Sequence, residues 1–392
     1  MPARIVVRRK RTAGLLPAER EGEFIIMKTR IMVLFGGNSS EYEVSLQSGA
    51  AVLDALDRER YEVFPVGITR QGRWLAYSGT TEEIRQDAWE ARPDCRRVWL
   101  SPEPEVHGCL LQSQNGIEAV RLDAVFPVLH GKNGEDGTVQ GLCGLAGIPV
   151  VGCGILSSAL CMDKHRAHRL AAAGGIAVPK GRVIRRSELL ADGHLPEGAA
   201  DGLRYPLFVK PVKSGSSFGV SRIEAPEELE RAAVLAFERD GEILVEEAVD
   251  GFEVGCAILG TSPLTVGEVD EIELAGDLFD YTEKYNLITS RIHMPARITA
   301  GTAQKVKETA VKLYRLLGCS GFARVDLFLT PDGTLVFNEV NTIPGFTSHS
   351  RYPNMMKGIG WSFERVVNTL AGLAAEPWSG GISPEIRSAG EI

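Results

Sequence analysis

The sequence predicts a protein of mixed α/β and α+β class that folds in three parts. Three observations support this prediction. The first third alternates short apolar runs with helical spacing, the middle contains a glycine- and serine-rich loop after an apolar run, and the last third carries a hairpin pattern. At roughly 150 residues per domain, the 392 residues suffice for two or three domains.

The first part, expected over residues 27–152, contains βαβ units and is predicted to form a parallel sheet. The runs "IMVLFGG", "YEVFPVGI" and "LDAVFPVLHG" are typical of strands, and "GIPVVGCG" is expected to be the last strand. Between the first two runs, "SSEYEVSLQSGAAVLDAL" has helical spacing. Ser39 or Ser40 is the expected N-cap of this helix.

The second part, expected over residues 153–245, begins with one amphipathic helix in "SSALCMDKHRAHRLAAAGG". His165 and His168 are expected to be solvated on the charged face of this helix. The strand "YPLFVKPV", a glycine-serine loop, the helix "PEELERAAVLAFE" and the strand "EILVEEAV" follow.

The third part, expected over residues 246–374, starts with the strands "FEVGCAILG" and "TVGEVDEIEL". A segment of charged and aromatic residues, Asp280–His293, separates them from a long helix and the hairpin "FARVDLFLTPDGTLVFNEV". Residues 1–26 are expected to be a disordered arm or a start-site artefact, and residues 375–392 a tail.

Composition excludes several classes of protein. The net charge of −8 disfavours a general binder of nucleic acid or of anionic membranes. No apolar run approaches the ~18 residues that a membrane span needs. The seven cysteines contain no CxxC pair, so neither a disulfide framework nor a zinc cage is expected, and a reducing cytoplasm fits best.

The loop "KPVKSGSSFG", residues 210–219, is a candidate phosphate site. Its small residues let backbone N–H groups and serine hydroxyls close over a phosphate, although the loop is not a Walker A motif. The alternative is an ordinary polar turn. Lys210 at the end of an apolar strand favours the phosphate site, because lysines are seldom buried without a partner.

The hairpin predicts a cluster of acids. With a two-residue turn at Asp332–Gly333, Asp326 faces Glu339 and Arg324 faces Asn341, all on one side of the sheet. Two carboxylates and an amide on one face would repel one another unless a hard cation such as Mg²⁺ lies between them.

The same register places Phe328 opposite Phe337. A three-residue turn would shift the register by one residue and remove the convergence. The alternative to a metal site is a surface network of Arg324 and Asp326.

Two further stretches are candidates for ligand contacts. Glu246, Glu247 and Glu253 surround a strand end and suit adenine and ribose contacts, the alternative being a solvated edge. The turn "HGKNGEDG" from His130 ends a strand, where ligands of α/β proteins tend to bind. His130 taken alone is equally consistent with a structural histidine.

Several motifs in order resemble D-alanine–D-alanine ligases of the ATP-grasp superfamily. They are "LFGGNSSEYEVSLQSG", "FPVLHGKNGEDGTVQG", "ALCMDK", "FVKPVKSGSSFG", "VEEAVDGFEVGCAILG", "FDYTEKY", "GFARVDLF" and "FNEVNTIPGFTSHSRYP". The resemblance covers the chain from about Met27 to a helix ending near residue 372. Through "EKYNL" and "TSHSRYP" it is greater to the vancomycin-resistance branch, above all to its D-alanine–D-serine ligases.

The resemblance implies a Rossmann-like N-terminal domain and two ATP-grasp subdomains that clamp ATP. It implies a homodimer, and ATP with two Mg²⁺ ions, or Mn²⁺, as cofactors. The γ-phosphate would pass to the carboxylate of D-alanine, and the amine of a second D-amino acid would attack the acyl phosphate. The product would serve peptidoglycan synthesis, in a resistance or a housekeeping role; a catalytically inactive ATP-binding regulator is the alternative of another class.

Catalytic roles follow from the resemblance position by position. Glu41 would hold the ammonium of the first D-alanine and join a hydrogen-bond link with Ser216 and Tyr285. Arg324 and the N–H of Gly345 would stabilise the developing oxyanion. The segment 280–293 would be a lid over the acyl phosphate.

The ligand sets are also implied by the resemblance. The residues that would bind ATP are Lys164, Lys210, Ser217, Glu246, Glu247, Val249, Glu253, Lys284 and Phe328. The residues that would hold the metal ions are Asp326, Glu339 and Asn341. His130 would lie near the first substrate, and Ser350 would bind the carboxylate of the second.

Position 351 departs from plain alanine–alanine ligases, many of which carry an aliphatic residue there. Arg351 needs a counter-charge, for which Asp270 is the candidate, and with Phe279 nearby the pair could hydrogen-bond a serine hydroxyl. Tyr285 argues against a D-hydroxy acid as second substrate. The alternatives are D-alanine as second substrate and a purely structural Arg351 salt bridge.

Overall fold

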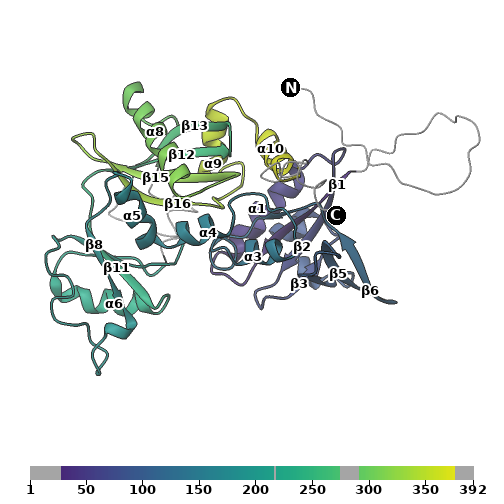
Figure 1. Ribbon diagram of the computed structural model, residues 1–392, viewed down its shortest axis with the longest axis horizontal. Coiled ribbons are helices and arrows are strands. Elements are labelled where there is room, and N and C mark those ends of the chain that lie inside the picture. Colours follow the sequence, from purple (N-terminus) through teal and green to yellow (C-terminus); the bar gives the residue numbers. More distant parts are fainter. Residues whose placement is uncertain (1–27, 216–217, 274–290, 376–392) are drawn as a thin grey trace, which may run out of the picture.

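The computed structural model describes residues 28–215, 218–273 and 291–375. Within these residues the chain forms three β-sheets with helices packed on them (Figure 1). The mixed α/β and α+β class predicted from the sequence is confirmed. None of the described helices is both long and apolar enough to cross a membrane.

The N-terminal sheet has seven strands. In spatial order they are β6 (Gly116–Arg121), β5 (Gly108–Ser113), β4 (Arg96–Leu100), β3 (Trp74–Ala76), β2 (Tyr61–Ile68), β1 (Thr29–Gly36) and β7 (Ala124–Pro127). Only β1 pairs in parallel, with β2 and β7; the pairs from β2 to β6 are antiparallel. The parallel pairing predicted from the sequence is confirmed for β1, β2 and β7. The antiparallel strands β3 to β6 were not predicted.

Helices cover both faces of the N-terminal sheet. Side chains of β1 alternate between the two faces, so apolar residues on each face pack against helices. Ile31, Val33 and Phe35 pack into the core that contains helix α1 (Tyr42–Ala55). Met32 and Leu34 join the core that contains α3 (Thr138–Leu145). The strand expected in "GIPVVGCG" is reduced to one bridge, between Val150 and Val125.

The start of α1 differs from the prediction. The N-cap position is Glu41, which makes no side-chain capping bond. Ser39 instead accepts a hydrogen bond from the Glu41 N–H (3.1 Å) and donates to the carbonyl oxygen of His130 (2.8 Å). Ser39 thus ties the start of α1 to the loop after β7.

The single helix predicted after residue 153 is two helices, α4 (Ile155–Met162) and α5 (Lys164–Ala173). Asp163 between them has extended backbone, and its carboxylate accepts from the Arg166 N–H (2.9 Å), capping α5. His168 is buried rather than solvated, because α5 packs against the C-terminal sheet.

The central sheet has four strands, in the spatial order β10 (Ser221–Ile223), β9 (Leu207–Pro211), β11 (Glu242–Glu247) and β8 (Gly181–Arg185). Helix α6 (Leu229–Phe237) packs on it through buried alanines and Phe237. The remaining short helices are α2 (Thr81–Arg85), η1 (Trp89–Ala91), η2 (Arg186–Glu188) and η3 (Pro226–Glu228).

The C-terminal sheet has five strands, in the spatial order β14 (Arg291–His293), β13 (Leu264–Glu273), β12 (Phe252–Gly260), β15 (Phe322–Leu329) and β16 (Leu335–Asn341). Helix α8 (Ala300–Leu316) packs on it through one apolar face. The last three residues of the segment expected as a lid form the edge strand β14; residues 280–290 lie outside the described residues.

The hairpin β15–β16 combines two irregularities that cancel. Its turn is one residue longer than predicted, so Leu329 pairs with Leu335 and Phe328 with Val336, not with Phe337. Asn338 is then an extra residue in β16, a bulge that shifts the register back by one. The imidazole of His168 lies 2.8 Å from the carbonyl oxygen of Asn338 at this bulge.

Beyond the bulge the predicted register is confirmed. Asp326 pairs with Glu339, and Arg324 pairs with Asn341. The four side chains therefore share one face of the sheet.

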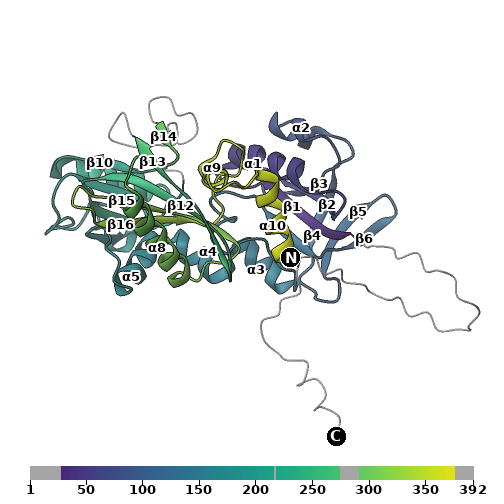
Figure 2. The ribbon, with the colours of Figure 1, turned by 90° about the horizontal axis from the view of Figure 1, so that it is seen from above.

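A shared aromatic core joins the N-terminal and C-terminal sheets. Phe126 of β7 contacts Phe322 of β15 and Phe346, with ring centroids 6.5 and 6.3 Å away. Helices α9 (Arg351–Gly358) and α10 (Phe363–Ala375) lie between the two sheets (Figure 2). This packing fixes the segment that follows β16 against the N-terminal part.

Candidate active site

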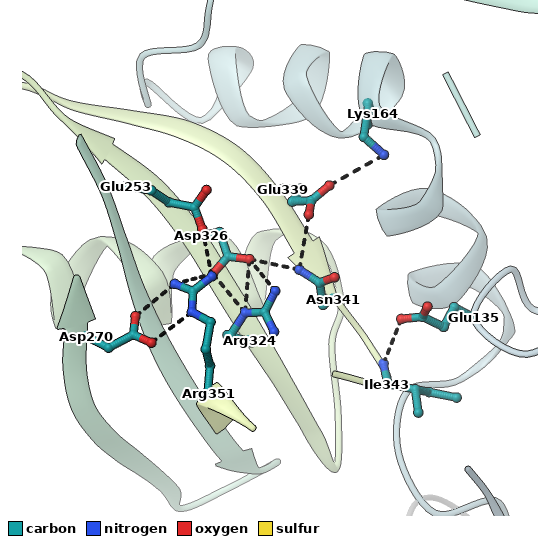
Figure 3. A network of polar contacts seen from close by, with 10 residues as sticks. All are labelled: Glu135, Lys164, Glu253, Asp270, Arg324, Asp326, Glu339, Asn341, Ile343 and Arg351. Atoms are coloured by element: carbon teal, nitrogen blue, oxygen red, sulfur yellow. Dashed lines mark hydrogen bonds and ion pairs between the residues drawn. The ribbon is translucent and has the colours of Figure 1, made fainter. Parts of the chain in front are cut away.

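The predicted acids and arginines gather on one face of β12, β13, β15 and β16 (Figure 3). Asp326 is at the centre and is 1% exposed. It accepts from Arg324 Nε (2.9 Å) and Nη2 (2.7 Å) and from the Asn341 amide (2.9 Å). Burial alone would raise the pKa of Asp326, but Arg324 and then Arg351 outweigh it and hold the pKa below its usual range.

Arg351, the first residue of α9, reaches the same cluster. Its guanidinium donates to both carboxylate oxygens of Asp270, each at 2.8 Å, so the expected counter-charge is present. It also donates to Glu253 (2.7 Å) and lies 3.3 Å from Asp326. Arg351 therefore connects Asp270, expected at the second substrate, with Glu253, expected at the nucleotide, and with Asp326, expected at the metal.

The expected metal residues fit Mg²⁺ in chemistry and charge. Asp326 and Glu339 offer carboxylate oxygens and Asn341 offers an amide oxygen, all on one face of the sheet. Four carboxylates in the network, Glu253, Asp270, Asp326 and Glu339, face three cations, Arg324, Arg351 and Lys164 (Figure 3). The excess negative charge favours binding of a cation. The arginines, however, already offset part of the repulsion between Asp326 and Glu339 from which the sequence predicted a metal ion.

The protein ligands alone do not complete a metal site. No group of three or more histidine, cysteine or acidic side chains that could hold a metal lies within the described parts of the chain. A metal bound by Asp326 and Glu339 would therefore need further oxygen ligands from substrate phosphates, as is usual for Mg²⁺.

Two lysines enter the site from different sides. Lys210 of β9 is 7% exposed and lies 2.5 Å from Glu246 of β11. Lys164 at the start of α5 donates to the carbonyl oxygen of Ser214 (2.7 Å) and lies 3.4 Å from Glu339. Lys164 thereby links the glycine-serine loop, α5 and β16, while Lys210 pairs within the central sheet.

The other acids and apolar residues expected at ATP lie beside this site. Glu247 pairs with Arg204 (2.9 Å), and burial opposes but does not overcome this arginine, which lowers the pKa of Glu247. Val249 after β11 and Phe328 on β15 are half-buried.

Glu41 is enclosed by two glycine-containing loops. A Cβ built on Gly131 would lie 2.3 Å from a carboxylate oxygen of Glu41, and one on Gly215 would lie 2.8 Å from the same oxygen. Larger residues at either position would displace Glu41. Glu41 is thus 5% exposed between the loop after β7 and the loop after β9.

Gly345 and Ser350 lie close to each other after β16. A Cβ on Gly345 would be 3.1 Å from the hydroxyl oxygen of Ser350. Ser350 Oγ accepts from the Thr347 N–H (3.1 Å). The segment after β16 therefore folds back so that these two predicted residues are adjacent.

Comparison with known families shows the family to which the chain belongs. A family model described as the D-ala D-ala ligase N-terminus matches residues 30–153, and one described as the D-ala D-ala ligase C-terminus matches residues 170–371. The chain belongs to the D-alanine–D-alanine ligase family. It is therefore a ligase, and its fold is the ATP-grasp fold that the resemblance implied.

Known relatives of this ligase differ in the second substrate that their names give. A putative D-alanine–D-lactate ligase of Streptomyces coelicolor is 46% identical over 88% of this chain and 98% of its own. A D-alanine–D-alanine ligase of Caldicellulosiruptor bescii is 41% identical over 89% of this chain and 96% of its own. The structure of the VanG D-Ala:D-Ser ligase from Enterococcus faecalis is 53% identical with a TM-score of 0.81, covering 89% of this chain and all of that one.

Five residues expected in the site of this ligase lie outside the described residues. They are Ser216, Ser217, Phe279, Lys284 and Tyr285. Their expected roles stay predictions.

Sequence reasoning missed one buried acid of the ligase, Glu135. Burial raises the pKa of Glu135 to about 8, and the nearby Glu41 carboxylate adds to the rise. The signal was an acid between glycines in "HGKNGEDG", directly after a buried strand.

Proposed function

We propose that this protein is an ATP-dependent ligase that joins D-alanine to a second D-amino acid, with D-serine preferred over D-alanine, for peptidoglycan precursors. The observation that carries the proposal is the buried Arg324–Asp326–Asn341 network, which Lys164 joins through Glu339. A lysine suited to a phosphate, acids suited to a metal and an arginine suited to an oxyanion support this proposal.

In the first step, a carboxylate oxygen of D-alanine attacks the γ-phosphorus of ATP and ADP leaves. Glu41 holds the ammonium group of D-alanine, while Lys164 and Lys210 neutralise phosphate charge. Asp326, Glu339 and Asn341 would hold two Mg²⁺ ions, which when bound offset the charge on the phosphates.

In the second step, the amine of the second substrate attacks the acyl carbon of D-alanyl phosphate. The carbonyl electrons move to oxygen, where Arg324 and the Gly345 N–H stabilise the negative charge. The bond from carbon to the phosphate oxygen then breaks, the nitrogen loses a proton, and the peptide and inorganic phosphate are released. Ser350 holds the carboxylate of the second substrate.

The preference for D-serine rests on Arg351 and Asp270. An arginine with a buried carboxylate offers hydrogen bonds to a hydroxyl, which the methyl group of D-alanine does not make. The likeness to the VanG D-Ala:D-Ser ligase supports the same choice. A homodimer is proposed from the family resemblance; a single-chain mass in sedimentation would exclude it.

The test is phosphate release in the presence of ATP and Mg²⁺. We expect release with D-alanine alone, a larger rate when D-serine is added, and no increase with D-lactate. L-alanine in place of D-alanine is the control and should give no release. Phosphate release that does not depend on D-alanine would exclude the ligase and favour a protein that only binds ATP.

A second outcome separates the two substrate proposals. If D-alanine alone supports ligation faster than D-alanine with D-serine, the protein is a D-alanine–D-alanine ligase and the argument from Arg351 fails.

A further inference from the structure

The segment between β16 and Ser350 is attached to the N-terminal part by three buried side chains. The segment runs from Thr342 to Phe346 and contains Gly345. The three side chains are Ser48 of α1 and His130 and Glu135 of the loop after β7, each less than 10% exposed. They make direct hydrogen bonds to the backbone of the segment.

The hydrogen bonds of His130 determine its tautomer. Nδ1 lies 2.9 Å from the carbonyl oxygen of Ile343, which can only accept, so Nδ1 carries the proton. Burial lowers the pKa of His130 and favours the neutral ring, in which Nε2 is an acceptor. The hydroxyl of Ser48, 3.0 Å from Nε2, therefore donates to it.

Ser48 and Glu135 complete the attachment. The Ser48 oxygen accepts from the Phe346 N–H (3.2 Å). One carboxyl oxygen of Glu135 accepts from the Ile343 N–H (3.1 Å), and the other from the Gly131 N–H (2.8 Å) (Figure 3 shows the bond to Ile343). The N–H and C=O of Ile343 are thus both held, and so is the N–H of Phe346.

Only Pro344 and Gly345 lie between these anchored residues. The proline ring fixes one backbone torsion and also restricts Ile343 before it. The direction of the Gly345 N–H is therefore set by residues of the N-terminal part, two of which belong to the loop that also encloses Glu41.

We propose that Ser48, His130 and Glu135 are positioning residues that hold the Gly345 N–H in place opposite Arg324 for the second step of ligation. This inference rests on the proposed function and adds to it residues that do not touch the reacting atoms. An oxyanion donor acts only when it is aimed at the charge that develops, and a misplacement of about 1 Å costs on the order of 10²-fold in rate.

The variant Glu135→Gln tests the proposal. Glutamine keeps one acceptor but places an amide N–H₂ against the second backbone N–H. We expect kcat for ligation to fall about 10–100-fold, while KM for ATP and for D-alanine stays within about threefold. The matched control is Asp136→Asn, which should leave kcat unchanged, since Asp136 accepts hydrogen bonds from the N–H groups of its near neighbours Asn133 and Thr138.

A second readout separates positioning from general damage. D-alanine-dependent positional isotope exchange in ¹⁸O-labelled ATP reports the first step, because ADP and D-alanyl phosphate return to ATP. In Glu135→Gln this exchange should persist near the wild-type rate while ligation falls. Equal loss of exchange and ligation, or wild-type values of both, would overturn the proposal.

Ser48→Ala provides the second variant if Glu135→Gln does not fold. It removes the acceptor for the Phe346 N–H and the donor to His130, so the same split between exchange and ligation is expected. If the wild-type protein itself shows no D-alanine-dependent exchange, the proposed function fails instead, and this inference fails with it.

Discussion

Replacing Arg324 by methionine is expected to lower kcat for ligation by about 10²–10³-fold, the typical effect of removing one oxyanion donor. Arg324 lies beside Asn341 across the hairpin, and its guanidinium is fixed by two nitrogen contacts to Asp326. Arg351 and Asn341 still contact Asp326 in this variant, so the acid keeps partners.

The measurement is peptide formation under saturating ATP and D-amino acids. Arg315→Met, at an exposed position of α8, is the control and should leave kcat unchanged. Arg324→Lys should rescue only part of the loss, because an ammonium group lacks the planar fork that contacts Asp326. Activity of Arg324→Met within threefold of wild type would contradict the oxyanion role.

Replacing Arg351 by leucine is expected to have two effects, on stability and on the choice of second substrate. Asp270 is 1% exposed and would lose both hydrogen bonds from the guanidinium. Removing one partner of a buried ion pair costs about 3–5 kcal/mol in the free energy of unfolding. The ratio of kcat/KM for D-serine over D-alanine should fall by about 10–100-fold.

The double variant Arg351→Leu with Asp270→Leu separates these effects. Replacing both charges with apolar side chains removes the acid that loses two hydrogen bonds, so part of the stability should return, although Glu253 still lacks Arg351. The preference for D-serine should stay lost. A single Arg351→Leu variant that keeps the wild-type ratio of kcat/KM would show that Arg351 is only structural.

The hairpin shows why part of this site was predictable. Alternation along two strands and a turn near Asp332–Gly333 were enough to place Asp326 opposite Glu339. The predicted turn was one residue too short. The pairing of Asp326 with Glu339 was nevertheless predicted correctly, because the bulge at Asn338 shifts the register back by one residue. That bulge contacts His168, which is 170 residues away in the sequence and was expected in solvent.

The need to pair a buried charge predicted one contact between residues far apart in the sequence. A buried arginine needs an acid, and Arg351 does pair with Asp270. No charged partner in the sequence indicated that Ser48 and Glu135 bond backbone groups of a distant loop. Backbone N–H and C=O groups are present at every position, so the sequence does not indicate which of them a buried side chain will bind.

Local breaks were equally hard to predict. Asp163 sits inside a continuous helical pattern, yet its carboxylate caps a new helix. The antiparallel strands of the N-terminal sheet follow connections that resemble any other surface segment, including the 19 residues between β3 and β4. In both cases tertiary packing decided between two locally acceptable structures.

The central claim is that D-alanine is activated as an acyl phosphate and then joined to an amine. The most direct test uses D-alanine labelled with ¹⁸O in both carboxylate oxygens, with ATP, Mg²⁺ and D-serine, and mass spectrometry of the products. The mechanism predicts one ¹⁸O atom in inorganic phosphate for each peptide formed, because the bridging oxygen leaves with the phosphate. Inorganic phosphate without ¹⁸O would mean that water attacked ATP and would contradict the account.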